Sequence, residues 1–217
     1  MRSLKFFLAA VLLATSPSIA GASTITLSQV SSDSTPASQL DATLDFVVAG
    51  ATLTLTVTNL TDGSLADFNI SELFFNGSDD VTSLSLISTT ALGSWALGTS
   101  AHAGGFGTYD FHLESTNNPA DVIETSAVFE LQINGGFGVF DMADFVGPDT
   151  FSSLPPGSLT AQGAAKFIQC VGADCINGDD SAFGASNGSG FPPVPEPGTA
   201  ALLGMGLIAL AHSCRRR

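Results

Sequence analysis

The chain has few basic residues, and almost none of them lie between its two ends. Of six Lys and Arg side chains, two fall in the first five residues and three close the chain, which leaves Lys166 alone between them. Nineteen of the 20 Asp and Glu side chains lie in residues 23–194. Because such a surface repels phosphate, and counterion release could not drive its binding, nucleic acid and anionic lipid surfaces are excluded as partners. The negative charge either attracts cations or keeps the protein soluble through self-repulsion, and we favour the second interpretation.

The first 22 residues have the composition of an export signal. Two cations precede an apolar run over residues 6–14, and a serine–proline pair and small residues through Ala22 follow. This layout is typical of a secretory signal peptide, with cleavage expected after Ala22 or Ala20. An uncleaved membrane helix is disfavoured because the apolar run is short and nothing after it would stop transfer. We therefore predict that residues 1–22 are a signal peptide and that the mature chain is exported.

Cysteine, tryptophan and tyrosine are scarce as well. Cys170 and Cys175 are separated by four residues, and no second pair of Cys or His lies near them to complete a tetrahedral zinc site. In an oxidising compartment we predict a local disulfide between them. Trp95 and Tyr109 are each the single residue of their type, so an aromatic platform for carbohydrate would have little material. The sixteen phenylalanines are expected mostly in the core.

Polar and apolar residues alternate in several parts of the chain. In residues 52–58, TLTLTVT, threonine and aliphatic side chains alternate without a break, which separates them onto two faces only if the segment is extended. Windows with helical spacing, such as residues 64–73 and 161–170, are few and short. Many short strands between Asn- and Gly-rich turns predict an all-β, antiparallel, jelly-roll-like β-sandwich over residues 23–175. The other predicted strands are residues 24–30, 43–48, 81–88 and 127–133.

The composition changes after Cys175. Residues 176–193 are rich in Gly, Ser and Pro and contain too little apolar material to bury, so we predict a flexible linker. Residues 198–214 are uncharged if His212 is neutral, and seventeen residues make roughly 25 Å of helix against a hydrocarbon core of about 30 Å. This length predicts a short transmembrane helix that spans the membrane at least transiently. Arg215, Arg216 and Arg217 would stay on the cytoplasmic side.

The end of the chain also carries a specific motif. Val194, Pro195, Glu196, Pro197 and Gly198 precede the apolar run and the arginine cluster, and this order resembles the PEP-CTERM sorting signal of Gram-negative bacterial envelope proteins. The resemblance covers about the last twenty-four residues. The two prolines that flank the glutamate lack backbone N–H donors and hold the motif in an extended conformation, which a protease at the membrane surface could recognise.

The resemblance implies a partner and a fate for residues 194–217. Exosortase, a multi-pass membrane protein with a cysteine-type transpeptidase-like site, recognises such signals, and it is understood to cut near Pro-Glu-Pro and to release or transfer the protein outward. The implied setting is exopolysaccharide, biofilm or floc formation. Cys214 departs from the plainest version of the signal, and we interpret it as a small apolar residue at the interface rather than a lipidation site.

Candidate catalytic residues occur in the strand-forming middle of the chain. Asp110 and His112 would share one face of a strand, as a catalytic dyad or metal pair requires. His102 lies nearby, but no Ser or Cys nucleophile can be assigned to either histidine. Paired carboxylates for glycoside hydrolysis could come from Glu114, Glu124 and Glu130. Solvent-facing polar residues on strands explain both sets more simply, and we expect no enzyme.

Acidic residues also gather in the expected turns, where oxygen-rich loops could bind calcium. None of these segments matches an EF-hand, so a solvated acidic surface is the favoured interpretation and a calcium site the alternative. We expect an exosortase-processed envelope or matrix protein, structural or adhesive in exopolysaccharide, with a calcium-dependent carbohydrate-binding module as the second hypothesis. The calcium candidates are Asp79, Asp80, Asp141 and Asp144.

Overall fold

The computed structural model describes residues 21–30, 40–61, 67–117, 120–135, 140–147, 150–152, 161–171 and 181–186. These residues belong to one compact unit, Gly21–Val194, and they are almost entirely β-structure. The predicted signal peptide up to residue 20, the sorting motif and the predicted transmembrane helix lie outside the described residues. The strands are β1 (Gly21–Val30), β2 (Ala42–Ala49), β3 (Thr52–Asn59), β4 (Asp67–Phe75), β5 (Val81–Thr89), β6 (Trp95–Ala103), β7 (Gly107–Ser115), β8 (Ser126–Gly135), β9 (Gly163–Val171) and β10 (Ala182–Ser186), with one short 3-10 helix, η1 (Met142–Asp144).

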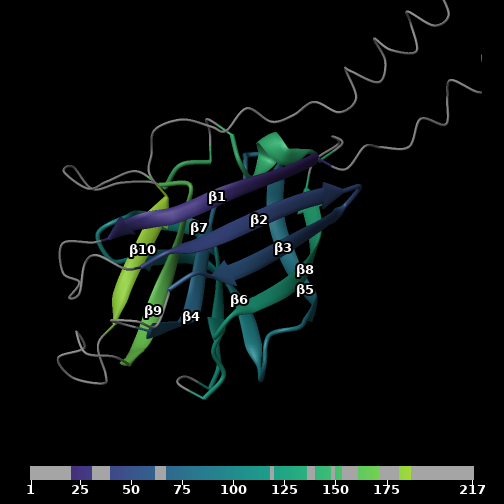
Figure 1. Cartoon of the computed structure of the whole chain (residues 1–217). Helices are drawn as coiled ribbons and strands as arrows, with labels where there is room; N and C mark the ends of the chain where they lie inside the picture. The colour runs from purple at the N-terminus through teal and green to yellow at the C-terminus, as the bar shows by residue number, and fades with distance from the viewer. Residues whose placement is uncertain are drawn as a thin grey trace, which may run out of the picture. The chain divides into compact units, whose positions relative to one another are not determined.

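All ten strands belong to one antiparallel sheet in the order β5-β8-β3-β2-β1-β10-β9-β4-β7-β6. The all-β class is therefore confirmed, but the strands form one continuous ladder instead of the two separate sheets of the predicted sandwich. Figure 1 shows β1, β2 and β3 crossing in front of β4 and β7. The aromatic ring of Phe46 on β2 packs against Phe75 on β4 with centroids 5.8 Å apart, so the two halves of the sheet face each other in a sandwich-like way.

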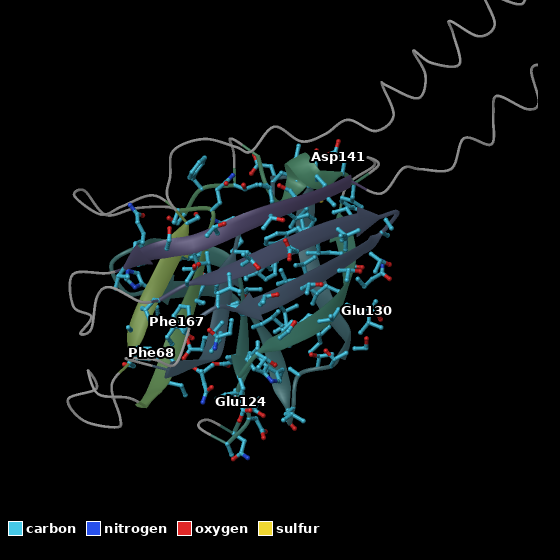
Figure 2. All side chains as sticks on the ribbon, viewed as in Figure 1. Phe68, Glu124, Glu130, Asp141 and Phe167 are labelled. Atoms are coloured by element: carbon cyan, nitrogen blue, oxygen red, sulfur yellow. The ribbon has the colours of Figure 1, made fainter. Side chains whose placement is uncertain are left out.

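The main core fills the space between these two halves. Strict alternation on β3 buries Leu53, Leu55 and Val57 and leaves the threonines between them half-buried on the other face, as the sequence predicts. Phe68 and Phe167, labelled in Figure 2, are fully buried in the same core. Burying each of these large side chains contributes about 1.5–3 kcal/mol.

A second apolar cluster, defined by Phe74, Ala103, Phe106, Tyr109, Ala161, Ala164 and Ala185, packs around β4, β6, β7, β9 and β10. It explains why alternation did not predict two of the strands. β4 and β9 lie in the two windows with helical spacing, and both are buried on their two faces, so apolar residues do not alternate with polar ones along them. A register shift between Ile70 and Glu72 disturbs the alternation further.

The prediction of a linker over residues 176–193 is wrong for residues 182–186, which form the strand β10. The polar composition of residues 176–193 indicated a tether, yet Ala182–Ser186 pairs with β1 on one side and with β9 on the other. Its alanines are small enough to be fully covered, and Ala182 and Ala185 are 2% and 0% exposed. A short strand rich in Gly and Ala therefore needs little apolar material of its own because its neighbours supply the core.

Candidate functional site

Asp110 and His112 lie on the outer face of β7, as predicted, but no hydrogen bond joins them. The Asp110 carboxylate accepts a hydrogen bond from the Gly77 backbone N–H at 3.3 Å, and the Asp110 backbone N–H donates to Asn76 Oδ1 at 2.7 Å. These contacts hold the turn after β4 against β7. The histidine instead lies near Glu114, with His112 Nε2 3.4 Å from Glu114 Oε2.

The imidazole of His112 is covered by its neighbours. It stacks on Phe74 with ring centroids 5.9 Å apart and ring planes 15° from parallel, and its side chain is 16% exposed. On its other side lies Gly98 of β6, where a Cβ would come within 2.2 Å of His112 Cε1. Glycine is therefore required at position 98 for the ring to lie flat on the sheet. This packing supports a structural role for His112 better than a catalytic one.

The predicted glutamates do not form one carboxylate site. Figure 2 shows Glu124 and Glu130 at separate places on the domain. Glu114 has a different neighbour, because register places it opposite Glu72 of β4. Glu72 in turn accepts a hydrogen bond from Lys166 Nζ of β9 at 2.6 Å.

This ion pair joins two neighbouring strands, β4 and β9, and sequence reasoning missed it. Lys166 and Glu72 are 27% and 21% exposed, so water screens their attraction only in part. The ion pair could have been predicted from the isolation of Lys166 among so many acidic residues, because a single cation inside an acidic domain needs a carboxylate partner. The pair leaves Glu114 to interact with His112.

The calcium candidates lie close together but are used in local structure. Asp141 caps η1 by accepting a hydrogen bond from the Ala143 backbone N–H at 2.8 Å, and Asp144 Oδ2 accepts one from the Asp141 backbone N–H at 2.8 Å. The other oxygen of Asp144 accepts from Ser78 Oγ at 2.6 Å. Asp79 and Asp80 follow that serine in an exposed turn. Within the described ranges, no three His, Cys, Asp or Glu side chains gather closely enough to hold a metal ion.

Trp95 and Tyr109 belong to the two cores rather than to a binding surface. Trp95 is 8% exposed, packs edge-on against Phe129 with centroids 5.2 Å apart, and donates from Nε1 to the Leu92 carbonyl at 3.2 Å. Tyr109 is 1% exposed and lies against Phe74. Burial raises the pKa of Tyr109 well above its usual range, and the nearby Ser152 side chain offsets part of that rise.

The carboxyl end of β10 is where the folded domain meets the predicted processing region. Ser186 is 5% exposed, and its hydroxyl accepts a hydrogen bond from the Gln162 backbone N–H at 2.9 Å. This contact fixes the last described residue to the chain entering β9. Eight residues, 187–194, then separate Ser186 from Pro195.

The predicted disulfide lies partly, and the predicted membrane segment wholly, outside the described residues. Cys170 belongs to β9, whereas Cys175 and Cys214 lie outside the described residues. No helix in the described part of the chain is long and apolar enough to cross a membrane.

Comparison with known proteins identifies the carboxyl-terminal segment. No curated protein and no solved structure matches the chain. Residues 193–217 match the family model of the PEP-CTERM protein-sorting motif, which contains the predicted Pro195, Glu196 and Pro197 together with the apolar run and the three arginines. The chain is therefore a protein that carries a PEP-CTERM sorting signal, and this signal implies export and sorting by an exosortase.

Proposed function

We propose that this protein is a non-enzymatic component of the cell envelope or extracellular matrix whose β domain is delivered by a temporary membrane anchor. The observation that carries the proposal is the match of residues 193–217 to the PEP-CTERM protein-sorting motif. In this scheme the signal peptide starts export, residues 198–214 stop the chain in the inner membrane, and an exosortase then cuts near Pro195–Pro197.

The charge at the end of the chain supports this orientation. Arg215, Arg216 and Arg217 would remain on the cytoplasmic side, as juxtamembrane cations usually do. The preceding seventeen residues are marginal in length for a span, which suits an anchor that has to hold only until the cut. The acidic domain would then lie outside, where its net negative charge keeps it apart from anionic headgroups.

The place of the motif after β10 in the sequence supports a cleavage site that lies beyond the described sheet. In sequence, Pro195 follows the last residue of β10 after a spacer of eight residues, 187–194. A cut near Pro195–Pro197 would leave every strand of the described sheet intact.

We favour a structural or adhesive role for the domain over a catalytic one. The candidate catalytic groups Asp110, His112 and Glu114 make contacts that hold turns and strands together. The carboxylates of Asp141 and Asp144 are occupied in capping η1. The alternative of a calcium-dependent carbohydrate-binding module has no observation among the described residues in its favour.

The processing step can be tested with a matched pair of variants expressed in cells that contain the exosortase. Glu196→Gln changes the motif without changing the size of the side chain, and we expect the full-length, membrane-associated form to accumulate. Glu130→Gln makes the same change at an exposed position on β8, and we expect normal processing. The readouts are the mass of the chain on immunoblots and its distribution between membrane and soluble fractions. If Glu196→Gln were processed and released like the unaltered protein, the proposed role of the motif would be wrong.

A further inference from the structure

Asparagine followed by glycine recurs in this chain. Four of its eight asparagines precede a glycine, at residues 76, 134, 177 and 187. In such a pair the backbone nitrogen of the glycine can attack the side-chain carbonyl carbon of the asparagine, because glycine has no side chain to hinder the approach. The structure describes two of these pairs, Asn76–Gly77 and Asn134–Gly135, and places them in opposite environments.

Asn134 and Gly135 lie at the exposed end of β8. Both residues are exposed, and the pairing of β8 with β3 ends at Gln132, so β5 is their single strand neighbour among the described strands. The Asn134 side-chain amide donates to Ser85 Oγ across 3.5 Å, longer than the about 2.7–3.2 Å of a usual hydrogen bond. Such a contact restrains the side chain little, so its carbonyl carbon can turn toward the Gly135 nitrogen.

The packing at this end of β8 requires the glycine. A Cβ atom at position 135 would lie 2.0 Å from the backbone oxygen of Asp80, in the turn that precedes β5. A larger residue at this position would force the turn to move. The fold therefore keeps the least hindered backbone nitrogen directly after an exposed asparagine.

Asn76 and Gly77 have the same chemistry in a closed environment. Asn76 is 3% exposed, its Nδ2 donates to the Thr150 carbonyl at 3.2 Å, and its Oδ1 accepts from the Asp110 backbone N–H at 2.7 Å. The Gly77 nitrogen, which would have to attack, donates to the Asp110 carboxylate at 3.3 Å. Reaction at Asn76 would break all three hydrogen bonds, so it requires local unfolding first.

We propose that Asn134 is a site of spontaneous deamidation in the folded protein, and that Asn76 is protected from the same reaction. The Gly135 nitrogen loses its proton and bonds to Cγ of Asn134, the Cγ–Nδ2 bond breaks, and the amide nitrogen leaves as ammonia with that proton. Water then opens the resulting cyclic imide at either of its carbonyl carbons, which gives aspartate or isoaspartate. The balance is one ammonia lost and one water gained, so the reaction needs no oxidant, reductant or cofactor.

The products differ from Asn134 in charge and in backbone length. Both carry a carboxylate close to the turn that contains Asp79 and Asp80, where like charges repel it. Isoaspartate also adds a methylene group to the backbone, which displaces Gly135 from its register with Val81. We expect the β5–β8 pairing to loosen at this end. This inference does not depend on processing by an exosortase.

The test follows both pairs in one preparation of the exported protein. The purified protein is incubated in mildly alkaline buffer, which favours loss of the glycine N–H proton, once folded and once in concentrated guanidinium chloride. Chymotrypsin cuts after Phe and Leu, so the four asparagine–glycine pairs fall in separate peptides. Mass spectrometry then measures the replacement of NH2 by OH in each peptide, and chromatography separates the aspartate and isoaspartate products.

In the folded protein we expect Asn134 to convert at least about ten times faster than Asn76, because Asn76 reacts only through local opening. In guanidinium chloride the two should convert at similar rates, because both precede glycine. The variant Asn134→Gln, whose longer side chain cyclises far more slowly, should lose the modification in its own peptide and leave Asn76 unaffected. Equal rates in the folded protein, or an Asn134 that stays intact in the folded protein while the denatured chain converts, would overturn the proposal.

Discussion

At the scale of single residues, Asp110 and His112 make contacts that join β7 to neighbouring strands and turns. Asp110 and His112 do point to one face of β7. Their partners come from other strands and turns, because Asp110 holds Asn76 and Gly77 while His112 lies between Phe74 and Gly98. Such contacts depend on strand order, and spacing within one segment contains no information about the order.

Tyr109 provides a pH test of the second core. The unfolded chain ionises its tyrosine near pH 10, whereas burial raises the folded-state pKa, so above pH 10 the folded state holds a proton that the unfolded state has lost. The free energy of unfolding should therefore fall by about 1.4 kcal/mol for each pH unit above 10 from this residue alone. Denaturant unfolding between pH 8 and pH 11 measures the effect.

The variant Tyr109→Phe serves as the control because it keeps the ring in the cluster and removes the ionisable group. We expect its stability to fall less steeply above pH 10 than that of the unaltered protein. Equal slopes would mean that the hydroxyl is not buried in the folded state.

At the scale of secondary-structure elements, alternation of polar and apolar residues predicted the strands that have one buried face and did not predict those that have two. The five strands predicted from alternation, of which residues 52–58 are the clearest, are confirmed as β1, β2, β3, β5 and β8. β4 and β9 were not predicted because apolar residues cover both of their faces. β10 was missed because Gly, Ala and Ser dominate its five residues, and the apolar surfaces that cover them come from β1 and β9.

The central position of β10 has a consequence for stability. A Cβ atom at Gly184 would lie 2.8 Å from Phe167 Cε2, and that ring is fully buried. Gly184→Val should therefore destabilise the domain by about 1–3 kcal/mol, the usual result of overpacking a core. For a domain of this size the expected fall in Tm is roughly 2–12 °C.

The matched control is Ala49→Val, which adds bulk at an exposed position at the end of β2. Thermal unfolding followed by circular dichroism should leave its Tm close to that of the unaltered protein. If Gly184→Val also unfolded at the unaltered temperature, β10 would not be packed against Phe167, and residues 182–186 would be better described as part of the linker.

At the scale of the whole molecule, the sequence was most informative about destination. The order of motif, apolar run and arginines is local, so a short contiguous segment could reveal it, and the family match confirms it. The domain offers no comparable local signature. Its polar contacts join residues far apart in the chain, as Lys166 and Glu72 do across β9 and β4.

The place of β5 at one end of the sheet also belongs to this scale, because it is defined only once all ten strands have been ordered. In residues 81–89 the sequence shows a strand but cannot show that the strand lies at the end of the sheet.

The most direct test of the central claim is the intact mass of the mature protein, taken from host cells with and without a functional exosortase. We predict that exosortase-containing cells yield a chain that starts at Ser23 or Gly21, after signal-peptide cleavage, and ends near Pro195–Pro197, with residues 198–217 removed. Cells without the enzyme should yield a chain that still ends at Arg217. A mature protein that retains residues 198–217 in both strains would contradict the account of a temporary anchor.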